Sequence, residues 1–206
     1  MGTREHWQQV YETKSPSEVS WYQASPTLSL ELIQATGLDH QASIIDLGGG
    51  ASRLVDELLD MGYEHLAVAD LSDAALATVR GRLGDRAGRV EWFVADATDW
   101  DPPGQWDLWH DRAVFHFQVE DAVRDGYLAA LHQGVKPGGW AMIATFALDG
   151  PKRCSGLPVQ QYGPEELLSV LGDQWRLVET RKELHETPSG SNQSFGYNLF
   201  QRAKAS

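Results

Sequence analysis

Short apolar runs alternate with helical patterns through most of the chain. Residues 43–47 form an apolar run typical of a buried strand, and residues 51–61 then follow a helical period with leucines on one face. The same alternation predicts the other central elements, which are strands at 65–69, 90–94, 106–109 and 140–146 and helices at 74–83, 120–132 and 164–171. Strands that alternate with helices build a parallel sheet covered by helices, so the pattern predicts an α/β fold.

The two ends of the chain depart from this alternation. Residues 4–13 and 26–35 are predicted to be helices, the second with Ser25 as its cap and Pro26 in its first turn. The chain is predicted to finish with a strand at 175–184, a long loop at 185–193 and a second strand at 195–202. With 206 residues and no internal repeat, we expect a single domain over residues 1–206.

Three consecutive glycines, Gly48, Gly49 and Gly50, separate the first predicted strand from its helix. Glycines allow a tight turn and let a ligand approach the backbone, while the helix that follows offers free N–H groups. A dinucleotide fingerprint would need a third spaced glycine where this chain has Arg53. Asp46, two residues before the first glycine, would repel a pyrophosphate but would suit a cationic amino group.

A second acidic residue, Asp70, stands at the end of the next predicted strand, twenty residues beyond Gly50. In open α/β sheets an acid at this place commonly holds the hydroxyl groups of a ribose. The alternative is a helix cap, but Ser72 is the better cap and leaves Asp70 free for a ligand. A third acid, Asp96, follows the strand after that.

The pattern from Asp46 to Ser52 (Asp-x-Gly-x-Gly-x-Ser) resembles motif I of the class I S-adenosylmethionine (SAM)-dependent methyltransferases. The later acids, the sequence Lys-Pro-Gly-Gly at 136–139 and the final strand pair are similar to that family in order and spacing. The resemblance covers residues 4–202. It implies a Rossmann-like, seven-stranded methyltransferase sheet, mostly parallel with an antiparallel strand near the C-terminus and with helices on both faces. It also implies SAM as the cofactor and S-adenosylhomocysteine as the product.

The resemblance also implies the roles of individual residues. Asp96 would accept a hydrogen bond from the adenine amino group, and Ala97 would supply a backbone N–H. The complete set expected to bind the cofactor is Asp46, Gly48, Gly49, Gly50, Asp70, Leu71, Asp96, Ala97, Asp111, Trp7 and Tyr11.

Four aromatic residues near the N-terminus have two compatible interpretations. Trp7 and Tyr11 share one helix face, and Trp21 and Tyr22 follow. They either pack against the sheet edge or close over the cofactor, where a sulfonium beside aromatic faces would gain about 0.5–2 kcal/mol. We therefore predict that residues 1–37 form a helical flap over the cofactor and substrate site.

Residues 110–117, which follow the fourth predicted strand, contain several side chains that could take part in catalysis. Catalytic candidates are Asp111, His116 and Arg112, and the residues expected to meet the substrate are Trp21, Tyr22, Phe115 and His116. Asp111 could instead cap a helix or pair with Arg112. Arg112 could also clamp an acidic substrate or the cofactor carboxylate. His116 is either packed between its neighbouring phenylalanines or a general base.

Two further candidates are predicted to have ordinary roles. His185 is expected to be a surface loop residue and Cys154 a loop cysteine, since no accompanying histidine and asparagine pattern supports a nucleophile. The histidines and the cysteine lack metal-ligand spacing, so we predict no metal site.

The composition of the chain limits the partners and the cellular compartment that we expect. The net charge of −12 argues against a nucleic-acid or anionic-membrane partner, and the arginines near residues 80–89 read as a solvated helix end. A single cysteine rules out an intrachain disulfide and favours a reducing compartment. No apolar run approaches the roughly 20 residues that span a bilayer. These features predict a soluble, cytoplasmic protein of undetermined oligomeric state.

Several functions compete. The leading hypothesis is methyl transfer to a small molecule, at sulfur or another soft nucleophile. The segment from Asp111 resembles the Asp-Arg-Gly segment of thiopurine- and thiol-type methyltransferases, with Ala113 replacing glycine, and also the Asp-Lys-Gly segment of some protein-lysine methyltransferases, with Arg112 replacing lysine, so it does not fix the acceptor. The alternative is therefore a protein-lysine methyltransferase. A third hypothesis is a SAM-binding regulatory protein without turnover. An NAD-linked oxidoreductase is disfavoured by Arg53 and Asp46.

Overall fold

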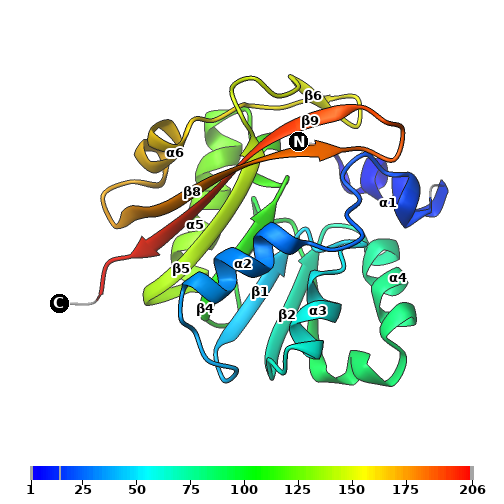
Figure 1. The fold of residues 1–206 in the computed structure, drawn as a ribbon, viewed down its shortest axis with the longest axis horizontal. Helices are drawn as coiled ribbons and strands as arrows, with labels where there is room; N and C mark the ends of the chain where they lie inside the picture. The colour runs from blue at the N-terminus through cyan, green and yellow to red at the C-terminus, as the bar shows by residue number, and fades with distance from the viewer. Residues whose placement is uncertain (1, 14, 205–206) are drawn as a thin grey trace.

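The computed structural model describes residues 2–13 and 15–204, which form one seven-stranded sheet and a separate two-stranded hairpin. The order of the sheet strands is β3-β2-β1-β4-β5-β9-β8 (Figure 1). Their bounds are Ser43–Leu47 (β1), His65–Asp70 (β2), Val90–Val94 (β3), Trp106–Arg112 (β4), Val135–Phe146 (β5), Trp175–Glu186 (β8) and Asn192–Arg202 (β9). The first five strands pair in parallel, and β9 is antiparallel to both of its neighbours. The predicted fold class is confirmed.

Helices cover both faces of the sheet (Figure 1). The helical elements are α1 (Arg4–Thr13), η1 (Pro16–Glu18), α2 (Thr27–Ala35), α3 (Leu54–Asp60), α4 (Asp73–Leu83), η2 (Gly84–Arg89), η3 (Phe115–Phe117), α5 (Asp121–Gly134) and α6 (Pro164–Leu171). Within the described residues, none of them has both the length and the apolar character needed to cross a bilayer.

The strand period explains the two layers. Ile44 and Ile45 are both fully buried but point to opposite faces of β1. Ile44 packs in a core with α3 and α4, whereas Ile45 packs in a core with α5 and α6. A strand buried on both faces is apolar at successive positions, and this is the run that marked β1 in the sequence.

The last hairpin is tighter than predicted. The strands β8 and β9 continue to Glu186 and from Asn192, and the turn between them is closed by a hydrogen bond from the Thr187 N–H to the Ser191 carbonyl (2.8 Å). The predicted long loop at 185–193 is therefore wrong, because cross-strand pairing of His185 with Gln193 extends the ladder. His185 is buried rather than a surface loop residue, and its Nε2 lies 2.8 Å from the carbonyl oxygen of Ser20.

Two other local predictions are corrected. The strand predicted at 140–146 begins earlier, at Val135, and the Lys-Pro-Gly-Gly sequence at 136–139 lies within β5 as a bulge, because the pairing with β4 jumps across these residues. Gly138 has φ +81°, which permits this irregular path. Cys154 belongs to a short strand, β6 (Arg153–Cys154), which pairs with β7 (Leu157–Pro158). Its side chain is buried, not part of an open loop.

Candidate functional site

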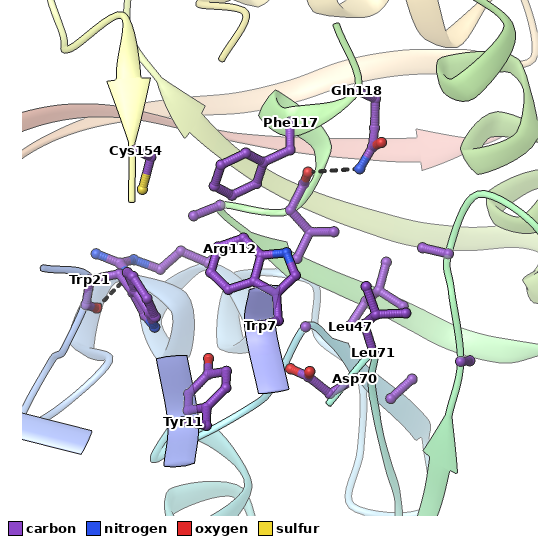
Figure 2. A pocket seen from close by; sticks show the side chains of 16 residues that line it. Trp7, Tyr11, Trp21, Leu47, Asp70, Leu71, Arg112, Phe117, Gln118 and Cys154 are labelled. Atoms are coloured by element: carbon purple, nitrogen blue, oxygen red, sulfur yellow. Dashed lines mark hydrogen bonds between the residues drawn. The ribbon is translucent and has the colours of Figure 1, made fainter. Parts of the chain in front are cut away.

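Two adjoining cavities lie at the carboxyl edge of the parallel strands, as is usual for ligand sites in open α/β sheets. The first is lined by the ends of β1, β2 and β4, by the segment after β3, and by rings from the N-terminal segment (Figure 2). The second extends from the glycine turn toward α2. Four residues line both cavities: Tyr11, Trp21, Gly48 and Arg112. A single elongated ligand can therefore occupy the two together.

The glycine turn must be made of glycines. Gly48 and Gly50 have positive φ angles of +63° and +36°. A Cβ atom on Gly48 would lie 2.1 Å from Cγ2 of Val114, and one on Gly50 would lie 2.5 Å from the Tyr11 hydroxyl. Such contacts exclude any side chain, so the turn brings its backbone close to the cavities.

The Asp46 carboxylate leaves one oxygen unused beside this turn. Its Oδ1 lies 2.6 Å from Nδ1 of His110, while Oδ2 is buried and has no hydrogen-bond partner within the described residues. A Cβ on Gly49 would come within 2.8 Å of Oδ2, so only glycine leaves that oxygen open. A buried acceptor without a donor is costly, and a ligand ammonium group would satisfy it. The residues present therefore fit the amino group of SAM.

Asp70 ends β2 and lines the first cavity. Its Oδ1 accepts a hydrogen bond from the Ser72 N–H (2.8 Å). Ser72 caps α4 by accepting from the Ala75 N–H (3.2 Å), as the sequence predicts, which leaves Asp70 available. Burial raises the pKa of Asp70 to about 7, and hydrogen bonds from backbone N–H groups oppose that rise only in part. Neighbouring donors such as ribose hydroxyls would suit its ionised form.

Near the ends of β3 and β4, the first cavity is lined by a polar residue that the sequence pattern does not single out, Gln118. Ala95 and Ala97 line the cavity, whereas Asp96 does not, and Oδ1 of Asp96 accepts from both the N–H and the hydroxyl of Thr98. Gln118 is buried; its Nε2 donates to the Val114 carbonyl, and its Oε1 has no hydrogen-bond partner in the part of the chain that the structure describes. Its only sequence signal is a polar residue within an apolar segment. The adenine role of Asp96 stays a prediction.

The N-terminal aromatic residues both pack and line the site. Trp7 contacts Trp21 and Phe117 edge to face, with ring centroids 5.7 and 5.2 Å apart. These three rings and Tyr11 line the first cavity, and Figure 2 shows Trp7 and Tyr11 projecting toward it from α1. Tyr22 lines the second cavity and not the first. The two interpretations drawn from the sequence are compatible in the structure.

Arg112 lies where the two cavities meet. Its Nε donates to the Tyr197 hydroxyl (2.7 Å), its Nη1 donates to the Trp21 carbonyl (2.9 Å), and the guanidinium stacks 4.5 Å from the Phe195 ring centroid. The side chain is only 9% exposed, and Nη2 makes no hydrogen bond within the described residues. Its ion-pair partner is Glu183, at 3.8 Å, and not the neighbouring Asp111.

Asp111 has a local structural role. Its carboxylate accepts hydrogen bonds from the Val114 N–H (2.9 Å), the Phe115 N–H (3.0 Å) and the Tyr127 hydroxyl (2.5 Å). These bonds hold the turn after β4, in which Ala113 takes φ +70°, a conformation that favours glycine. Burial raises the pKa of Asp111 to about 6. Its side chain lines neither cavity.

His116 is packed away from the cavities as well. Its ring centroid lies 4.6 Å from that of Phe117 and 4.7 Å from that of Phe146, and its Nδ1 accepts weakly from the Phe146 N–H. Burial lowers the pKa of His116 to about 3. Cys154, in contrast, lines the first cavity, and burial raises the pKa of its thiol to about 11. Of the residues expected to meet the substrate, Trp21 and Tyr22 line cavities, whereas Phe115 and His116 do not.

Comparison with known proteins agrees with this geometry. A family model described as a methyltransferase domain matches residues 44–139. The eEF1A lysine and N-terminal methyltransferase of Mus musculus is 22% identical over 102 residues, covering 50% of this chain and 14% of that protein. The ubiquinone/menaquinone biosynthesis C-methyltransferase UbiE of Methylobacterium nodulans is 29% identical over 109 residues, covering 50% and 42% respectively. The chain thus matches less than half the length of each relative.

Solved structures match nearly the whole chain. A protein from a study of the conversion of a disulfide bond into a thioacetal group during echinomycin biosynthesis superimposes with a TM-score of 0.79 and 22% identity, over 99% of this chain and 94% of that one. The 1,6-didemethyltoxoflavin-N1-methyltransferase of Burkholderia thailandensis, solved with S-adenosylhomocysteine, superimposes with a TM-score of 0.72 and 18% identity, over 98% and 87%. The domain match includes the glycine turn, and the two superimposed structures show that the chain has the methyltransferase fold, with the seven-stranded sheet that positions this turn.

Proposed function

We propose that the protein transfers the methyl group of SAM to a small molecule through a soft nucleophile, with a thiol as the leading candidate. The observation that carries this proposal is the absence of a suitable base among the described residues that line the first cavity. Its ionisable residues are Tyr11, Asp70, Arg112 and Cys154. Asp70, at the end of β2, lies near Tyr11, and it is the carboxylate that the ribose hydroxyls would occupy (Figure 2). A thiolate needs no base at the moment of transfer, whereas an ammonium group must first lose a proton.

The chain's own residues would bind and orient the two reactants. SAM supplies an electrophilic methyl group on a sulfonium sulfur. Asp46 would hold the amino group, Asp70 the ribose hydroxyls, and Ala97 and Asp96 the adenine edge. We further propose that residues 1–37 act as a flap of the single domain, since Trp7, Tyr11 and Trp21 cover the first cavity and would exclude water from it.

Arg112 supports an acceptor that carries negative charge. Its Nη2 lies 3.8 Å from Glu183 but makes no hydrogen bond within the described residues, and the guanidinium lies at the junction of the cavities, near aromatic rings and the Cys154 thiol. A cation in such surroundings lowers the pKa of a bound thiol and favours the thiolate. The cofactor carboxylate is the other anion that could reach this guanidinium.

The comparisons support a small acceptor in part. One structural neighbour comes from work on a disulfide converted to a thioacetal, and another methylates a nitrogen of 1,6-didemethyltoxoflavin. The name of the mouse relative favours a protein-lysine substrate, and a net charge of −12 would suit a basic peptide. The first cavity nevertheless offers a lysine no base. The acidic charge also supports our proposal that nucleic acids are not substrates, and the one buried cysteine is consistent with a cytoplasmic location.

The test is transfer of tritium from labelled SAM in a cell lysate, with products separated into small-molecule and protein fractions. We expect label in the small-molecule fraction, lost when the Asp70→Ala variant replaces the wild-type protein. Label only in protein would overturn the small-molecule proposal. Calorimetric binding of S-adenosylhomocysteine with label in neither fraction would favour the non-catalytic, SAM-binding hypothesis.

A further inference from the structure

A buried chain of three polar side chains ends at the free oxygen of Asp46. The Ser29 hydroxyl lies 2.9 Å from Nε2 of His110, and Nδ1 of His110 lies 2.6 Å from Oδ1 of Asp46. Asp46 and His110 are direct partners in the pairing of β1 with β4, and Ser29 comes from α2. The three residues are 0–4% exposed, and all three line the second cavity.

The chemistry of these groups determines which atoms can donate and which can accept in the hydrogen bonds between them. An ionised carboxylate can only accept, so the hydrogen between Asp46 and His110 is carried by Nδ1 of the imidazole. The Ser29 hydroxyl can both donate and accept, so it is a suitable partner for Nε2 of His110. The three residue types also form the triad of serine hydrolases. In those enzymes the serine is the reactive end, whereas here the group without a hydrogen-bond partner among the described residues is Oδ2 of Asp46.

We infer that His110, held by Ser29, is a positioning residue that fixes the Asp46 carboxylate so that Oδ2 faces the amino group of SAM. The terminal torsion of an aspartate is broad, so a single carboxylate does not hold one orientation by itself. His110 fixes Oδ1 on one side. On the other side, a Cβ on Gly49 would lie 2.6 Å from Cγ1 of Val68 and 2.8 Å from Oδ2, so the glycine leaves just enough room. This inference concerns the cofactor and does not depend on which acceptor is methylated.

The experiment compares two ligands by calorimetry. S-adenosylhomocysteine carries the amino group, whereas 5′-methylthioadenosine has the same nucleoside without the amino-acid end. We expect His110→Ala to weaken binding of S-adenosylhomocysteine about tenfold or more, because a hydrogen bond to a charged group is lost. Binding of 5′-methylthioadenosine should change less than about twofold. Asp46→Ala should show the same selectivity with a larger loss.

Two conservative variants separate positioning from packing. The amide of an asparagine can place an N–H near the position of Nδ1, whereas the amide of a glutamine reaches the position of Nε2. His110→Asn should therefore recover most of the affinity for S-adenosylhomocysteine, and His110→Gln should not. Ser29→Ala should give a smaller, equally selective loss.

Three results would overturn the inference: equal losses for the two ligands, no loss for either, or equal behaviour of the asparagine and glutamine variants. If His110→Ala does not fold, the asparagine and glutamine pair decides the matter alone. Circular dichroism and thermal melting of every variant establish that the compared proteins are folded.

Discussion

At the scale of single residues, Asp70 is the group whose ionisation should most directly make cofactor affinity depend on pH. Burial raises its pKa from the ordinary 3.8 to about 7. Ribose hydroxyls donate hydrogen bonds, so they bind the ionised carboxylate better than the protonated acid. Bound nucleoside therefore favours loss of the proton, and affinity should fall as the pH drops below about 7.

We predict that the Kd for S-adenosylhomocysteine rises by up to about tenfold per pH unit below that value. Calorimetry between pH 5.5 and 8.5 measures this slope. Asp70→Asn should bind more weakly at pH 8.5 and lose the slope, because its amide does not titrate. An unchanged slope in the variant would assign the effect to another group.

The structural role of Asp111 can be tested by removing the Tyr127 hydroxyl, which donates a hydrogen bond to it. The Tyr127 hydroxyl donates to Asp111 (2.5 Å) and accepts from Nε1 of Trp109 (3.1 Å). Tyr127→Phe removes both bonds in a dry core and should lower the free energy of unfolding by about 2 kcal/mol or more in urea titrations. Affinity for S-adenosylhomocysteine should change less than twofold, because Tyr127 lines neither cavity.

A second buried tyrosine provides the matched control. The ring of Tyr63 is 2% exposed, and its hydroxyl makes no hydrogen bond within the described residues. Tyr63→Phe should therefore cost much less. Equal losses in the two variants would mean that the bonds to Asp111 contribute little.

Among the elements, α1 differs from the rest of the fold. None of its residues is fully buried, although Trp7 and Tyr11 reach the first cavity. Apart from these rings, α1 is linked to α4 by Gln8, whose Oε1 accepts from the Ser72 hydroxyl (3.0 Å) and the Ala74 N–H (3.3 Å). A helix held by so little buried surface opens more readily than the sheet.

We expect α1 amides to exchange rapidly in the free protein and to become protected when S-adenosylhomocysteine is added. Hydrogen exchange followed by mass spectrometry measures both states. Helix α5, which buries Tyr127 and Leu131 completely, is the internal control and should change little. Equal protection of α1 with and without ligand would contradict the proposed flap.

For the whole molecule, the buried acid at the site opposes stability. Below its folded pKa of about 7, Asp70 keeps a proton that the unfolded chain has released above 3.8. The folded state then binds more protons than the unfolded state, so this group makes stability fall as the pH rises from about 4 to 7. The Asp70→Asn variant should not lose stability in this way, because its amide does not titrate.

The melting temperature of Asp70→Asn relative to wild type should therefore rise between pH 4 and pH 7 and stay level above that. Thermal melts without ligand measure the difference. Leu71→Ala, beside Asp70 but not titratable, should show no such trend. A difference between Asp70→Asn and wild type that does not vary with pH would mean that Asp70 ionises normally in the folded protein.

The acidic residues of the site show which parts of it can be predicted from local sequence pattern. Asp46 and Asp70 each follow an apolar run, and parallel strands bring their ends to one edge, so their proximity could be predicted. The partners of Arg112 could not, because Tyr197 and Glu183 are 85 and 71 residues away in the chain. Nor does any local pattern place Gln118 beside the cavity.

The sequence by itself determined the α/β class, the glycine turn and the acids at the ends of β1 and β2, because each follows from short-range period and residue chemistry. Only the tertiary structure decided which polar groups are already paired. Asp111 and His116 have the residue types of catalysts, but the Asp111 carboxylate is hydrogen-bonded to the turn after β4 and to Tyr127, and His116 packs against phenylalanine rings. His110 and Ser29 become partners only because a strand and a helix meet across the fold. The physical reason is that a hydrogen-bond partner is chosen by distance in space, which periodicity along the chain does not encode.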